Sequence, residues 1–111
     1  ILEDVKGNSS LPVIAKLPIE GCEPSLLADI AHQNGADAVA STGRFIGIVP
    51  DIETEECMLG GHVGYGGSWV VPNTCAWAAR MYKAAPKRTL IPGGGVSSWE
   101  DAVKVILCGG T

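Results

Sequence analysis

The chain has 111 residues and a formal net charge of −4 at pH 7, and only 18% of its residues are charged. A negative charge argues against a nucleic-acid-binding protein, which needs a basic surface for the phosphate backbone. Hydrophobic residues make up 46% of the chain, which is enough for a core and unlike a disordered segment. We therefore expect a single globular unit, at most one domain. The chain contains 15 glycines, about twice the usual ~7%, which predicts tight turns or close approaches of backbone to a ligand.

The sequence contains four cysteines, at Cys22, Cys57, Cys75 and Cys108, and only two histidines. Because the cysteines form no C-x-x-C pair, the spacing predicts no zinc site. We expect four reduced thiols in a cytoplasmic protein, although an even number of cysteines also fits two disulfides. No apolar run is long enough for a membrane span, and the first residues do not have the form of a signal peptide. Since the chain has no initial Met and ends without a stop signal, we expect it to be cut from a longer protein.

Hydrophobic patterning in the first part of the chain predicts a strand, a helix and a second strand. Residues 11–17 form an apolar run interrupted only by Lys16, which is typical of a strand covered on both faces. Residues 24–35 have Pro in the first turn, apolar residues at helical spacing and Gly at the end, so they predict a helix. A second short strand is expected at residues 36–42.

The second part of the chain predicts a long loop, a helix, a third strand and a last helix. Residues 43–68 are too long for a simple connection, and we expect a functional or mobile loop. One apolar face predicts a helix at residues 72–85, and residues 88–93 predict the third strand. Residues 97–100 have the spacing of a capping box, S-x-x-E, at the start of the last helix. We expect this helix to bury Trp99, Ala102, Val103 and Ile106.

Alternating strands and helices predict parallel strands joined by right-handed crossovers. Two architectures have this pattern, the doubly wound sheet and the (β/α)₈ barrel. Both bind ligands at the carboxyl ends of their strands. Lys16, residues 41–44 and residues 93–95 all lie at predicted strand ends, so we expect them to form one site.

Each candidate residue has a functional and a structural interpretation. Lys16 in an apolar strand must pair with an anion or reach an opening, so it is either a fixed cation beside a ligand or a lysine that reaches solvent or pairs with Glu20. The glycines at 93–95, before a capped helix, predict a phosphate cradle or simply a tight turn. Arg44 is either a ligand for an anionic substrate or a surface residue. His62, in a glycine-rich loop, is either an acid or base or a solvated side chain.

Four segments together resemble the FMN-dependent dihydroorotate dehydrogenase family, which includes the flavin domain of dihydropyrimidine dehydrogenase. They are residues 12–17, 34–38, 64–72 and 91–102, in the family's order. The resemblance implies an α/β fold in which residues 1–111 form a single partial domain, about three βα units of a (β/α)₈ barrel. It also implies FMN as cofactor and hydride transfer between a dihydropyrimidine-like substrate and flavin, in pyrimidine metabolism.

The resemblance assigns cofactor-binding roles to four residues. The family lysine matched by Lys16 contacts the flavin ring near the position that gains negative charge on reduction. The family glycines matched by Gly94 and Gly95 approach the FMN phosphate, and the one matched by Gly67 lies in a turn near the cofactor. These roles agree with the electrostatic interpretation of Lys16 and of the glycine turn.

Two positions differ from the family pattern. Gly43-Arg44 stands where the family usually has Asn-Thr, and Gly66 stands where it often has Ser. Both differences remove side chains that form hydrogen bonds. Arg44 is the candidate substrate-binding residue among them.

The resemblance also implies that the chain lacks two parts of the barrel. In the family, the loop with the Cys or Ser base precedes the lysine strand, and the final strand would follow Thr111. We therefore expect no catalytic residue here, and an oxidoreductase fragment that is inactive alone. The alternative is a non-catalytic βα domain that binds a phosphorylated ligand or acts as a structural or assembly unit. If the chain folds alone, we expect self-association through exposed strand edges or apolar helix faces, and we expect no nucleic-acid or membrane partner.

Overall fold

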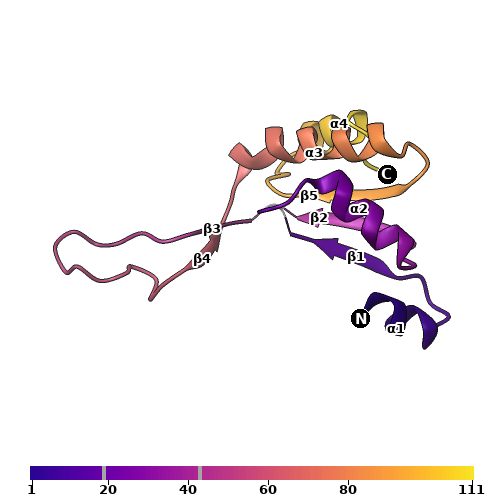
Figure 1. Ribbon diagram of the computed structural model, residues 1–111. Coiled ribbons are helices and arrows are strands. Elements are labelled where there is room, and N and C mark those ends of the chain that lie inside the picture. The colour runs from indigo at the N-terminus through magenta and orange to yellow at the C-terminus, as the bar shows by residue number, and fades with distance from the viewer. Residues whose placement is uncertain (19, 43) are drawn as a thin grey trace.

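The computed structural model describes residues 1–18, 20–42 and 44–111, and its centre is a sheet of three parallel strands (Figure 1). The strand order is β1 (Ile14–Leu17), β2 (Ala38–Thr42) and β5 (Thr89–Gly93). The helices are α1 (Leu2–Gly7), α2 (Pro24–Gln33), α3 (Val71–Ala84) and α4 (Trp99–Leu107). The α/β class and the three parallel βα units expected from the sequence are therefore confirmed. In the described part of the chain, no helix is long and apolar enough to cross a membrane.

The core lies on one face of this sheet. Val39 and Leu90, from β2 and β5, are fully buried against Ala31 of α2 and Met81 of α3. Parallel strands joined by right-handed crossovers place successive helices on the same side of a sheet. The core is therefore built from one face of the sheet and the helices α2 and α3.

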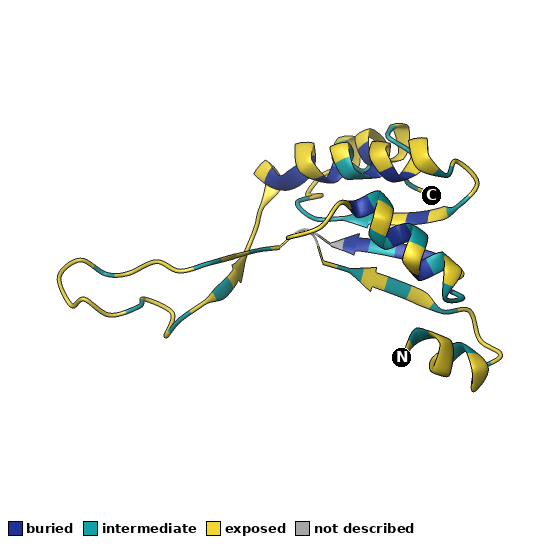
Figure 2. Cartoon of the chain, viewed as in Figure 1, coloured by how far each residue is buried: buried dark blue, intermediate teal, exposed yellow. Residues whose placement is uncertain are grey.

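The opposite face of the sheet is open in this structure (Figure 2). On β1, Ala15 and Leu17 pack against the core, whereas Ile14 is 54% exposed and Lys16 is exposed. The prediction that this strand is covered on both faces is therefore wrong for these residues. An apolar run indicates that burial of both faces is favourable, but it does not show which segment covers each face.

The stretch expected to be a loop contains an antiparallel hairpin. Its strands are β3 (Phe45–Gly47) and β4 (Val63–Tyr65), and a 3₁₀-helix, η1 (Ser68–Val70), leads from it into α3. The connection between the strands projects away from the sheet (Figure 1). The radius of gyration is 16.4 Å, compared with about 13 Å for a compact domain of ~100 residues. The extended hairpin therefore makes the chain less compact than a typical domain of this length.

Three aromatic rings fix the base of the hairpin next to α3. Phe45 stacks on Trp69 with a centroid distance of 5.5 Å, and Tyr65 stacks on the same indole at 5.7 Å. Such offset aromatic contacts hold their partners in defined positions. The rings join β3 and β4 to η1, so the residues at the hairpin base have defined positions relative to the start of α3.

The last helix begins one residue later than the sequence predicts. Ser98 is the N-cap, and its hydroxyl accepts a hydrogen bond from the Asp101 amide at 3.3 Å. The Asp101 carboxylate accepts from the amide and hydroxyl of Ser97. The predicted box from Ser97 to Glu100 is wrong because Ser98 has the extended backbone of a cap and places Asp101 three positions later.

The apolar face predicted for α4 is not the face that packs. Val105 is buried, whereas Trp99 is 74% exposed and Val103 and Ile106 are also exposed. α4 contacts α3, but within the described residues the large apolar side chains of the predicted face are left uncovered. Periodicity alone located the helix but misassigned its buried side.

Asp37 links α1 to the sheet. Its carboxylate accepts a hydrogen bond from the Val13 amide at 2.7 Å and pairs with Lys6 at 2.5 Å. The stem of Lys6 packs on Gly35, where a Cβ would lie 3.1 Å from its Cγ. The hydrogen bonds from Lys6 and Val13 hold the pKa of Asp37 below its usual value of 3.8.

We expect α1 to detach from the sheet in acid. Because the pKa of Asp37 is lowered in the folded state, the contribution of this carboxylate is complete above its ordinary pKa and is lost as the pH falls through the folded-state pKa. Amide NMR signals of Lys6 and Val13, followed from about pH 6 to about pH 2, should report this step. Asp37→Asn should abolish it, and Glu53→Gln, in the remote hairpin, should leave it unchanged. A step that persists in Asp37→Asn would assign it to another group.

Candidate functional site

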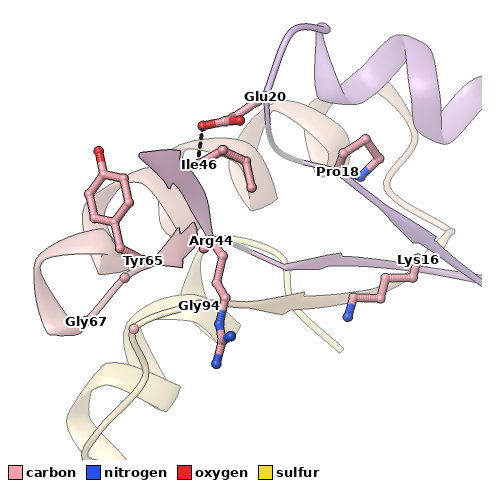
Figure 3. Close-up of a pocket in the computed structure, with 11 residues that line it drawn as sticks. Lys16, Pro18, Glu20, Arg44, Ile46, Tyr65, Gly67 and Gly94 are labelled. Atoms are coloured by element: carbon pink, nitrogen blue, oxygen red, sulfur yellow. Dashed lines mark hydrogen bonds between the residues drawn. The ribbon is translucent and has the colours of Figure 1, made fainter. Parts of the chain in front are cut away.

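A cavity of about 890 Å³ opens at the carboxyl ends of the parallel strands (Figure 3). This volume lies within the range of small-molecule sites, roughly 300–1,000 Å³. The cavity is lined by residues from β1, the hairpin base and the two glycine-rich turns. All five site residues singled out from the sequence line it: Lys16, Arg44, Gly67, Gly94 and Gly95. The structure therefore brings together residues that are up to 79 positions apart in the chain.

Lys16 is positioned by β1 on the open face of the sheet. The strand register places it beside Ala40 of β2, which lies beside Ile91 of β5. Its side chain extends into the cavity (Figure 3). Glu20, considered from the sequence as a partner of Lys16, instead accepts a hydrogen bond from the Ile46 amide at 2.8 Å. Lys16 therefore presents its charge to the cavity beside a small apolar wall.

Arg44 supplies a second positive charge from the hairpin base. Its stem packs on Gly64, where a Cβ would lie 3.3 Å from the Arg44 Cδ. The guanidinium extends into the same cavity as Lys16 (Figure 3). Within the described residues, neither cation forms an ion pair. Gly43, the other half of the Gly43-Arg44 difference, lies outside the described residues.

The two glycine turns that the sequence predicts separately are in direct contact. Gly94 and Gly95 have φ angles of 125° and 76°, in the region that favours glycine. A Cβ on Gly95 would collide with the carbonyl oxygen of Gly67 and lie 3.1 Å from the Val71 amide nitrogen. Val71 begins α3, at the positive end of the helix dipole, and its own amide donates to the Ser68 carbonyl oxygen of the preceding 3₁₀-helix. Backbone donors at such a turn are suited to an anion.

Thr74 is a residue that the sequence reasoning missed. Its side chain is 1% exposed, and its hydroxyl donates to the Gly94 carbonyl oxygen at 3.0 Å. This hydrogen bond ties the glycine turn to α3 one turn after the helix begins. The sequence did contain a signal for this role, because Thr74 places a hydroxyl on a helix face that is otherwise apolar.

Other candidates from the sequence lie away from this arrangement. His62 and Cys57, in the projecting hairpin, do not line the cavity. In the described ranges, no group of three or more His, Cys, Asp or Glu residues has the geometry of a metal site. The cavity combines the positive charges of Lys16 and Arg44 with the backbone of a glycine turn, and this combination is suited to an anionic small molecule.

Substitution at Gly95 tests the contact between the two turns. Gly95 and Gly60 have nearly equal φ angles, 76° and 75°, but a Cβ on Gly60 meets nothing within 4 Å. Gly60→Ala should cost about 1 kcal/mol in the free energy of unfolding because of the left-handed backbone alone. Gly95→Ala should cost about 2 kcal/mol more because of the collision with Gly67. Urea unfolding measures both values, and equal costs would contradict the contact.

No protein-family model matches the chain, but curated relatives do. The chain is 34% identical over 106 residues to the catalytic subunit of dihydroorotate dehydrogenase B (NAD(+)) of Methanosarcina acetivorans, covering 95% of the chain and 34% of that protein. It is 34% identical over 114 residues to the same subunit from Thermococcus kodakarensis, covering 98% and 36%.

A second type of relative gives the same result. The chain is 30% identical over 108 residues to dihydroorotate dehydrogenase A (fumarate) of Lacticaseibacillus paracasei, covering 96% of the chain and 37% of that protein. The chain thus spans about a third of the length of these relatives. Its parallel βα units and strand-end cavity agree with part of a (β/α)₈ barrel. The chain belongs to the dihydroorotate dehydrogenase family.

Proposed function

We propose that this chain forms part of the FMN site of an oxidoreductase that resembles dihydroorotate dehydrogenase. The observation that carries the proposal is the contact of Gly95 with Gly67 at the start of α3, in the same cavity as Lys16. FMN combines a phosphate with a planar ring that becomes anionic on reduction. The cavity offers the glycine backbone as a cradle for the phosphate and the Lys16 ammonium as a cation for the reduced ring.

The residues of the cavity have separate roles in this proposal. The backbone of Gly94 and Gly95, beside the start of α3, binds the phosphate, since no side chain keeps the ligand from this backbone. Thr74 holds the glycine turn in place from beneath. Lys16 stabilises the negative charge that the flavin ring acquires, and the bound flavin supplies the hydride chemistry.

Arg44 binds an anionic group of the substrate in this proposal. A guanidinium recognises a carboxylate through two parallel hydrogen bonds, and packing on Gly64 limits the positions that the Arg44 stem can take. The relatives are named for dihydroorotate, a pyrimidine that carries a carboxylate. A pyrimidine-like carboxylate is therefore the substrate class that the cavity supports best.

We further propose that residues 1–111 are one partial domain, completed by other strands of the barrel. The supporting observations are the relatives' length and the open face of the sheet, on which Ile14 and Lys16 lie exposed. A barrel interior is normally filled by side chains from all eight strands. The general base then lies outside these residues, and the chain alone is inactive.

Flavin retention tests the proposed cofactor site. After the chain is mixed with FMN and desalted, it should keep a flavin absorbance band, and riboflavin, which lacks the phosphate, should be retained at least about tenfold less well. Lys16→Ala should weaken FMN retention. Lys87→Ala, at the opposite end of β5, should not.

The same measurement on the full-length protein covers the case in which the isolated chain retains no flavin. If retention appears there and depends on Lys16, the remaining strands are needed and the proposal holds. If the full-length protein retains no FMN, the proposal fails. If it binds phosphorylated ligands but does not oxidise dihydroorotate, the chain is a non-catalytic binding domain.

Substitution of Arg44 tests the proposed substrate contact in the flavin-loaded protein. Orotate binding, followed by the change in flavin absorbance, should weaken by about tenfold or more in Arg44→Ala, because a charged hydrogen bond is lost. Arg44→Lys should recover part of the loss. Uracil, which has no carboxylate, should bind equally to all three proteins. Equal weakening of both ligands would show that Arg44 has only a structural role.

A further inference from the structure

A second cavity lies between α3 and α4, apart from the site described above. It has a volume of about 500 Å³, and its wall includes Cys75 on α3 and Cys108, the residue that ends α4. Both cysteines are partly buried and free. Lys104 and Asp101, which form an ion pair at 2.9 Å, lie on the same wall. The cavity is therefore a pocket with two thiols and a charged rim.

The backbone, rather than the cysteines, holds the end of α4 against α3. Gly109 has a φ angle of 107°, and a Cβ at this position would collide with the side chain of Tyr82 on α3. The Thr111 amide then donates to the Leu90 carbonyl oxygen of β5 at 2.8 Å. Cys108 lies immediately before this anchored segment. The contacts of residues 109–111 therefore fix the position of Cys108 relative to α3.

The two thiols are neighbours within this pocket. Burial is the largest cause that raises the pKa of Cys75, and the nearby Cys108 thiol raises it further. The ammonium of Lys104 acts in the opposite direction, and the Asp101 carboxylate adds to the increase. Two thiols that line the same small cavity between contacting helices can meet to form a disulfide, provided that their backbone atoms allow it.

We propose that Cys75 and Cys108 form a reversible dithiol–disulfide site that joins α3 to α4 and that reacts with low-molecular-weight disulfides. One protein thiolate attacks a sulfur of such a disulfide, forming a mixed disulfide and releasing one small thiolate. The second protein thiolate attacks the protein sulfur of the mixed disulfide and releases the other small thiolate. Two protein thiols are oxidised, one small disulfide is reduced, and the two protons pass to the small thiols.

The cross-link would act on the helices that flank the first cavity. Ser68, the first residue of η1 after Gly67, and Val71, the first residue of α3, also line the second cavity. α4 begins soon after Gly95, so both helices start at the two glycine turns. The disulfide site itself does not depend on the proposed flavin site, because its chemistry needs no bound cofactor.

The other two cysteines serve as internal controls. Cys22 is exposed before α2, and Cys57 lies in the connection between β3 and β4. Neither of them lines the second cavity. Their thiols should react singly and form mixed disulfides that persist, because no second thiol is placed to displace the small molecule.

The experiment incubates the native chain with mixtures of oxidised and reduced glutathione, blocks free thiols with an alkylating agent and maps the products by mass spectrometry. We expect a peptide pair joined through Cys75 and Cys108, loss of these two free thiols together, and their return on addition of dithiothreitol. In Cys75→Ser or Cys108→Ser, the remaining cysteine should retain one glutathione. The variant Cys22→Ser/Cys57→Ser should form the cross-link as the parent does.

Two results would overturn the proposal. The first is persistent glutathionylation of both Cys75 and Cys108 in the parent chain, since a neighbouring thiol would have displaced the glutathione. The second is a cross-link that forms equally well in concentrated urea, because the folded structure would then have no part in bringing the thiols together. Cys75→Ala and Cys108→Ala repeat the test if a serine variant does not fold.

Discussion

The candidate site depends on one close backbone contact, that of Gly95 with Gly67 and the start of α3. The contact excludes any side chain at position 95, because a Cβ would occupy the space of the Gly67 carbonyl oxygen. It joins the turn after β5 to the turn that leads from the hairpin into α3. Thr74 reinforces it from the buried side through its hydrogen bond to Gly94. The polypeptide thereby creates a concave surface of backbone groups beside a helix N-terminus, which suits a phosphate.

Around this contact, the two faces of the sheet have different roles. One face is covered by α2 and α3 and contains the core, including Val39 and Leu90. The other is open, and it carries Lys16 toward the cavity into which the hairpin base also brings Arg44. The separation allows a charged side chain to project from an apolar strand without being buried in the core. In a (β/α)₈ barrel, the corresponding face of the strands lines the interior, which side chains from all the strands fill.

α3 is the element shared by the two cavities. Its first residue, Val71, lies against Gly95 where the two glycine turns meet. Its Cys75 lines the second cavity, between α3 and α4. The two pockets differ in chemistry, since one presents cations and backbone donors and the other presents paired thiols. Close-packed interiors transmit strain, and α3 is the packed element through which the two pockets are connected.

The sequence by itself determined the order of strands and helices, the parallel α/β class, and five of the residues that line the first cavity. The elements and four of these residues follow from local periodicity, from Gly and Pro at element ends, and from the rule that ligands bind at the carboxyl ends of parallel strands. Gly67 follows from the family resemblance instead. Lys16 was recognisable because a charge interrupts an apolar strand. Only the tertiary structure decided the pairing of β3 with β4, the buried side of α4, the role of Thr74 and the meeting of Cys75 with Cys108. Each of these depends on contacts between residues distant in sequence, which local patterns do not encode.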